Sequence, residues 1–221
     1  MDIQNNNKKI IRELAAAYGK ENKSRNRILV LAIMVSIFLL YSSFSIASGK
    51  IEADYLLDVR GMGTLATVSL ENGSSRQYKK MKALPYLKAV GIKQVAASGK
   101  VQGNWSGSLI FLDPDAYRKI MCPAYTDIKG EYPQKEHEVM MSERCLRQLG
   151  IEKPQLGMDI PMDVEFKNGA KEEKCFQLSG FYVDYTDSVV EELEAFISKE
   201  FLEKNKIPMF PASKILAVHK D

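Results

Sequence analysis

The sequence predicts an α+β domain preceded by one transmembrane helix. Residues 28–48 form an uninterrupted apolar run, whereas residues 49–221 mix short alternating segments with short helical segments in irregular order. The 221-residue chain is 45% hydrophobic and 27% charged, with a net charge of +3. This composition excludes a disordered or fibrous chain, because enough apolar residues are present to form a core.

The apolar run reads ILVLAIMVSIFLLYSSFSIAS and contains no charged residue, Pro, Gly, Asn or Gln. A bilayer core about 30 Å thick needs about 20 helical residues at about 1.5 Å each. The residues expected in the span include Ile28, Leu31, Val35, Phe38, Leu39, Phe44 and Ser48. The serines of its second half favour packing against other helices. Two alternatives are a buried helix of a soluble core and a signal peptide cleaved near residues 45–47.

Charge predicts the orientation of the span. Residues 1–27 contain seven Lys or Arg and three Asp or Glu, a net charge of +4, so the other 194 residues carry −1. By the positive-inside rule, the N-terminus is expected in the cytoplasm and residues 49–221 outside it, in a protein of the cell membrane. The net positive charge of the chain therefore comes from a membrane-flanking arm. No nucleic-acid-binding motif accompanies it, so nucleic acid is not an expected partner.

Residues 1–27 are predicted to form a cytoplasmic amphipathic arm. Its apolar helical face consists of Ile10, Ile11, Leu14, Ala15 and Tyr18, and Gly19 is expected to end the helix. The basic residues expected at the anionic inner leaflet are Lys8, Lys9, Arg12, Lys23, Arg25 and Arg27. The alternative is an ordinary solvated amphipathic helix.

The first half of the extracytoplasmic domain is predicted to begin with a strand over 64–70 and a turn at Asn72-Gly73. A helix is expected over 76–90, interrupted at Pro85 and ended by Gly91. Two strands over 92–101 and 107–112 follow. A short helix over 113–121 is expected to be capped by Asp113 or Asp115.

The second half gives clearer local signals. A strand over 137–141 precedes a helix over 142–150, and strands over 160–166 and 175–183 form a hairpin about Asn168-Gly169. A capping box, Ser188-x-x-Glu191, is expected to open a final helix with a buried stripe of Val190, Leu193, Ile197 and Phe201. The irregular order of strands and helices favours α+β over a doubly wound fold.

No catalytic, cofactor-binding or metal-ligating residue is assigned, and an enzyme is not expected. The Ser-Gly-Lys triplets at 48–50 and 98–100 lack the first glycine of a Walker A loop, so ATP hydrolysis would require a partner. Cys122, Cys145 and Cys175 lack the spacing of zinc ligands and are expected to be inert. Asp113 and Asp115, like Glu191, Glu192 and Glu194, are interpreted as a cap and a solvated helix face. Met140-Met141 is expected in the core, with an apolar cargo-facing surface as the alternative.

Two stretches of the sequence resemble one family of membrane proteins. The basic arm followed by ENKSRNRILVLAI at the start of the span resembles the N-terminal part of an FtsX-like ABC transporter permease. The stretch HEVMMSERCLRQLGIEKPQLGMDIPM and the return strand FQLSGFY resemble the MacB-type periplasmic core domain. These pieces cover most of residues 8–185, and their order is the specific part of the resemblance.

The resemblance implies a membrane protein that transmits conformational change. Its expected partners are a cytoplasmic ABC ATPase subunit, a second permease subunit and membrane lipid, and its expected role is export or mechanotransmission. Permeases of this family have four or about ten spans. The present sequence shows no second span, so a truncated permease, an excised fragment or a one-span relative is expected. The alternative function is a single-pass anchored extracytoplasmic binding module without an ATPase; an extracytoplasmic hydrolase has no motif behind it.

Overall fold

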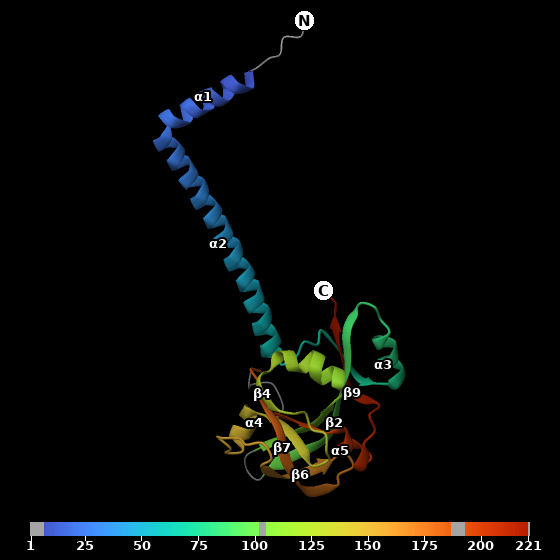
Figure 1. Cartoon of the computed structure of the whole chain (residues 1–221). Helices are drawn as coiled ribbons and strands as arrows, with labels where there is room; N and C mark the ends of the chain where they lie inside the picture. The colour runs from blue at the N-terminus through green and yellow to red at the C-terminus, as the bar shows by residue number, and fades with distance from the viewer. Residues whose placement is uncertain (1–6, 102–104, 187–192, 221) are drawn as a thin grey trace. The chain divides into compact units, whose positions relative to one another are not determined.

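The computed structural model describes residues 7–101, 105–186 and 193–220 (Figure 1). The chain divides into two compact units, Met1–Asp54 and Tyr55–Asp221. The combination of one long apolar helix with a mixed sheet and several short helices confirms the predicted fold class. The domain limits after residues 27 and 48 stay predictions.

Two helices account for the N-terminal region: α1 (Asn7–Glu21) and α2 (Lys23–Met62). Gly19 lies inside α1, so the prediction that it ends the helix is wrong. A glycine costs an exposed helix only about 1 kcal/mol relative to alanine, too little to stop a helix without a favourable alternative. The side chain and backbone of Asn22 both donate to the Tyr18 carbonyl at 3.1 Å, where α1 gives way to α2.

The apolar run forms part of α2, which continues past Ser48 to Met62. Among the described residues, α2 is the one helix long and apolar enough to cross a membrane. Its most apolar 18-residue window has a mean hydropathy of 2.3, and none of that window is buried. The alternative of a buried helix in a soluble core is therefore wrong.

The domain is built on a nine-stranded mixed sheet. Its strands are β1 (Val68–Gly73), β2 (Leu87–Val101), β3 (Trp105–Leu112), β4 (Thr126–Gly130), β5 (Glu138–Ser142), β6 (Asp159–Phe166), β7 (Lys171–Val183), β8 (Leu193–Ile197) and β9 (Ala212–His219). They pair in the order β1-β9-β2-β3-β8-β5-β7-β4, and β6 pairs with both β2 and β7. The strands β2, β3, β8, β5, β7 and β6 therefore form a closed circuit. The β3–β8 and β5–β7 pairs are parallel.

One hydrophobic core draws residues from every strand of this circuit. Examples are Ala97, Leu109, Ala195, Val139, Leu178 and Val164, each at most 2% exposed. A second core is formed by other side chains of β2, β3, β5, β7 and β8 together with β9, and it includes residues of the π-helix η1 (Ala116–Met121). The strand alternation thus separates two apolar layers, as a pleated sheet with both faces covered requires.

Short helices complete the domain. These are α3 (Ser75–Lys82), the 3-10 turn η2 (Cys122–Ala124), α4 (Glu143–Gln148) and α5 (Lys199–Lys204). The predicted helix after residue 142 is confirmed, with the Ser142 hydroxyl accepting a hydrogen bond from the Cys145 backbone at 3.2 Å. The predicted hairpin is also confirmed, with Ile160 opposite Phe176.

The helix predicted over 76–90 is too long. It ends at Lys82, and β2 begins at Leu87, so Gly91 lies inside a strand rather than at a helix end. Residues 89–92 are all buried between β9 and η1, and this burial decides in favour of the strand. The strand predicted over 64–70 instead begins at Val68 and extends to Gly73.

The prediction of a final helix is also wrong for those of its residues that the structure describes. The box at Ser188 and Glu191, with Val190 and Glu192, lies outside the described residues. Leu193–Ile197 is β8, inserted between β3 and β5, and a helix begins only at Lys199 behind a Ser198 cap. Pairing with strands on both sides outweighs the local helical pattern.

Gly91→Ala tests the close packing of β2 on η1. A Cβ atom at residue 91 would lie 2.5 Å from backbone atoms of Ala116, so we expect the free energy of unfolding to fall by about 1–3 kcal/mol. Urea unfolding of the detergent-solubilised chain measures the change. Gly61→Ala, which meets no atom within 4 Å, is the control and should not destabilise the chain. Equal stability of the Gly91 variant and wild type would contradict this packing.

Candidate functional site

The last two turns of α2 belong to the domain. Val59 is buried there, at 4% exposure. The guanidinium carbon of Arg60 lies 5.4 Å from the ring centre of Tyr185, in the segment that follows β7. The Tyr185 hydroxyl in turn lies 2.9 Å from the Thr126 hydroxyl on β4. The end of α2 is therefore attached to the sheet through an apolar contact and a cation–π contact.

Arg144 on α4 holds the same segment from another side. Its guanidinium lies 3.2 Å from the Asp184 carboxylate and donates hydrogen bonds to the carbonyl and hydroxyl of Thr186, at 2.9 and 3.1 Å. Among the described residues, its buried Nε atom has no hydrogen-bond partner. Residues 184–186 thus connect α2 with α4, and we call them the junction segment.

The first strand of the domain lies beside the last described strand. The Thr67 backbone donates to the Ala217 carbonyl at 2.9 Å, and the Thr67 hydroxyl accepts from the His219 backbone at 3.0 Å. From there β1 runs antiparallel to β9. The Leu65 backbone donates to the Ile120 carbonyl at 2.8 Å, which fixes the segment between α2 and β1 on η1.

A cleft of about 270 Å³ lies beside this junction. Residues 62–69 form one wall, and the ion pair between Lys93 and Glu194 lies on another, next to Arg144 and Cys145. Burial raises the pKa of Tyr125, which also lines the cleft, and the nearby Glu194 carboxylate raises it further. The charged side chains that line the cleft are engaged in ion pairs. The cleft is therefore better suited to holding structural elements together than to transferring protons.

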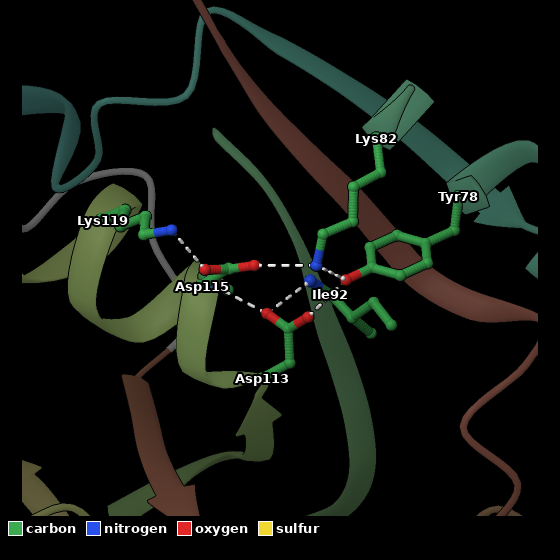
Figure 2. Close-up of polar contacts among 7 residues, drawn as sticks. Tyr78, Lys82, Ile92, Asp113, Asp115 and Lys119 are labelled. Atoms are coloured by element: carbon green, nitrogen blue, oxygen red, sulfur yellow. Dashed lines mark hydrogen bonds and ion pairs between the residues drawn. The ribbon is translucent and has the colours of Figure 1, made fainter. Parts of the chain in front are cut away.

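A buried carboxylate connects α3 to the sheet (Figure 2). One oxygen of Asp113 accepts from the backbone of Ile92 at 3.0 Å and of Ala116 at 2.8 Å, and the other accepts from the Tyr78 hydroxyl at 3.0 Å. Burial and the Asp113 charge raise the pKa of Tyr78, so its phenol remains a proton donor. Asp113 therefore acts as the predicted cap of the short helix and also anchors α3.

Asp115 forms the outer part of this network (Figure 2). It lies 2.7 Å from Lys119 and 2.9 Å from Lys82, which also donates to the Tyr78 hydroxyl at 3.4 Å. The hydrogen bonds from Lys119 and Lys82 lower the pKa of Asp115, and the Asp115 carboxylate raises the pKa of Lys82. The interpretation of Asp113 and Asp115 as structural residues is consistent with this geometry.

The predicted lipid-contacting residues all have exposed side chains. Ile28, Leu31, Val35, Phe38, Leu39, Phe44 and Ser48 lie on α2, and Lys8, Lys9, Arg12, Lys23, Arg25 and Arg27 lie on α1 or the first turns of α2. Ser36 and Ser43 donate to carbonyl groups of their own helix, at 2.9 and 2.8 Å. Contact with lipid stays a prediction for these residues.

The cysteines and methionines lie in separate environments. Cys122 is half-buried, Cys145 buried and Cys175 exposed, all as free thiols. Within the described ranges, no three His, Cys, Asp or Glu side chains gather as a metal site would require. Met140 and Met141 are fully buried, so the core interpretation of this pair is confirmed and the cargo-facing alternative is wrong.

The junction residues Arg60, Arg144, Asp184 and Tyr185 were not expected from the sequence. Each is an ordinary charged or aromatic residue in its local context. Their partners are distant in the chain, and no short motif relates them. Only the pairing of strands brings them together.

Three solved structures are similar to this chain. The periplasmic region of MacB from Actinobacillus actinomycetemcomitans has 13% identity and a TM-score of 0.45, covering 75% of this chain and 78% of that one. The extracellular domain of the noncanonic ABC-type transporter YknZ from Gram-positive bacteria has 8% identity and a TM-score of 0.41, covering 72% and 84%. A domain described as part of a permease protein from Porphyromonas gingivalis has 10% identity and a TM-score of 0.43, covering 69% of each chain. No protein-family model and no curated protein matches the sequence.

Asp115→Asn tests the outer network through its pH dependence. A carboxyl group with a lowered folded-state pKa stabilises the fold above its unfolded pKa, near 3.8, and loses that contribution as the pH falls through the folded value. We therefore expect the variant to be less stable than wild type at neutral pH, and the difference to shrink as the pH falls below 3.8 and to be lost once the pH is below the lowered pKa of folded Asp115. Urea unfolding across a pH series measures this. A difference that persists unchanged at low pH would contradict the assignment.

Proposed function

We propose that this chain is the membrane-anchored N-terminal part of an ABC transporter permease subunit. In this proposal residues 28–48 span the membrane, residues 1–27 lie in the cytoplasm, and residues 49–221 form an extracytoplasmic domain. A separate ABC ATPase in the cytoplasm and a second permease subunit complete the transporter. The domain serves export or the transmission of conformational change.

The observation that carries this proposal is the pairing of Thr67 with Ala217 and His219. A domain inserted between two membrane helices must receive and return the chain at the same place. The antiparallel pairing of β1 with β9 provides that arrangement, because β9 runs back toward the residues where β1 begins. A terminal module on a tether has no such requirement, although adjacent ends are common in domains generally.

The continuity of α2 supports mechanical coupling. From Ser48 to Met62 the helix continues without interruption, a rise of about 21 Å at 1.5 Å per residue. A flexible tether would absorb movement of the span, whereas a continuous helix passes on its rotation and translation. Arg60 connects the end of α2 to the junction segment through Tyr185, and Arg144 connects that segment to α4.

Cysteine labelling tests the proposed orientation. The exposed Cys175 should react with a membrane-impermeant maleimide on intact cells or spheroplasts if the domain lies outside the cytoplasm. The matched control is Lys9→Cys with Cys175→Ser, which should be labelled strongly only after lysis. The opposite pattern would place the domain in the cytoplasm and overturn the proposal.

Purification from membranes tests the proposed partner. The affinity-tagged full gene product should bring with it a nucleotide-hydrolysing subunit, because the sequence contains no Walker A loop of its own. ATPase activity of the purified complex is the measurement. An intact product that repeatedly lacks such a subunit would favour the single-pass binding module instead.

A further inference from the structure

Positive charge is strongly segregated within the domain. Residues 72–112 contain seven Lys or Arg and no Asp or Glu, although residues 28–221 as a whole carry a net charge of −1. Two of these cations are engaged: Lys82 pairs with Asp115, and Lys93 pairs with Glu194. The others must either be solvated or meet an anion from outside the domain.

Three of the remaining cations lie together on α3. Arg76, Lys79 and Lys80 are exposed, and none of them forms an ion pair with a described residue. Together with Ser75 and Ala83 they line a shallow hollow on the surface. Residues three and four apart are neighbours on a helix, so these like charges repel one another by about 0.2–0.5 kcal/mol per pair. The arrangement is therefore slightly unfavourable for the isolated domain.

The helix end does not explain the cluster. Cations in the last turn, such as Lys79 and Lys80, are favoured by the partial negative charge of the carbonyl end. Arg76 lies in the first turn, where a cation is disfavoured and the Ser74–Gln77 capping box already satisfies backbone groups. A bound external anion would offset both the repulsion among the three cations and the unfavourable position of Arg76 at the N-terminal end of the helix.

The apolar side of α3 faces the domain. The Tyr78 ring lies 6.0 Å from that of Phe210 and its hydroxyl donates to Asp113, and Met81 packs on the core of β2 and β9. This contact fixes α3 and leaves only polar side chains outward. A helix that inserts into a membrane surface needs an exposed apolar face beside its cations, whereas cations without such a face gain only about 1 kcal/mol each from an anionic leaflet.

The other basic helix shows the contrast. On α1, Ile10, Ile11 and Leu14 are 62–72% exposed next to Lys8 and Lys9. The exposed surface of α3 offers no such group for insertion among lipid chains. The charge on α3 therefore suits a partner that stays in water.

We propose that Arg76, Lys79 and Lys80 form a binding surface for a linear, phosphate-bearing polyanion. Guanidinium and ammonium groups are strong hydrogen-bond donors to phosphate oxygens. Because the cations are held in a row on one anchored helix, successive phosphates of one chain bind without ordering the protein first. This surface is separate from the junction and does not depend on the proposed transporter.

The test uses the full chain in nanodiscs of neutral lipid with fluorescent linear polyphosphate as the probe. A background of Lys8→Gln, Lys9→Gln and Arg12→Gln lowers the contribution of the arm. R76Q/K79Q/K80Q should bind at least about tenfold more weakly at low salt. Its slope of log affinity against log salt should be smaller by about two, from three lost contacts at about 0.7 each.

The matched control is K100Q/K153Q/K167Q, which removes three exposed lysines elsewhere on the domain. It should bind like its parent chain. An equal loss in both triple variants would show that only net charge matters and would overturn the proposal, as would unchanged binding in R76Q/K79Q/K80Q. The α3 variant should unfold at the same temperature or higher, because the substitutions remove repulsion.

Two further probes identify other partners. Binding to vesicles of phosphatidylglycerol should depend on Lys8, Lys9 and Arg12 and not on the α3 cations. Dependence of vesicle binding on α3 would make this a lipid-binding surface and overturn the proposal. Tighter binding of single-stranded DNA than of polyphosphate of equal charge would show that bases or sugars are recognised besides phosphates, and would overturn the proposal in favour of nucleic acid.

Discussion

The structure depends on the removal of the apolar surface of α2 from water. Its large side chains between Ile28 and Phe44 are mostly half to three-quarters exposed, and burying each one fully is worth about 1.5–3 kcal/mol. The described protein offers no surface that covers them, whereas the domain has three apolar cores of its own. The domain is therefore stabilised by its own internal packing, whereas the apolar surface of α2 relies, in the proposed function, on surrounding lipid. The continuous backbone of α2 is what joins them.

This separation gives the junction its importance. In the proposed transporter, movement of the span reaches the domain through the contacts at the end of α2 and through the segment that follows, where the Leu65 backbone donates to the Ile120 carbonyl. Val59 supplies an apolar contact, and Arg60 supplies a cation–π contact with Tyr185 worth about 0.5–1 kcal/mol at an exposed site. Arg144 holds the same segment through an ion pair and two hydrogen bonds.

Local chemistry made part of this fold predictable. Ser142 caps a helix, and Asn168-Gly169 reverses a hairpin, because both depend on residues adjacent in sequence. The prediction of a helix at Leu193–Ile197 was wrong, because these residues form a strand. The partners of that strand, β3 and β5, are distant in the chain. The prediction that Gly91 ends a helix was wrong for a related reason. In the sequence alone this glycine resembles a helix stop, whereas in the structure it lies in a strand where the close approach of Ala116 requires a glycine. The apolar span was evident, but the junction residues were not, since their partners meet only after the sheet has formed.

The two basic helices show why charge alone does not identify a partner. α1 and α3 have similar runs of Lys and Arg, and composition would assign both to the same anionic surface. The difference lies in Tyr78 and Met81, which the domain holds inward, against Ile10 and Leu14, which remain outward. Asp113 is central to this difference, because its carboxylate fixes Tyr78 and so the orientation of α3. A buried acid thus acts together with the apolar contacts of Tyr78 and Met81 to hold one side of a basic helix inward and leave its cations facing water.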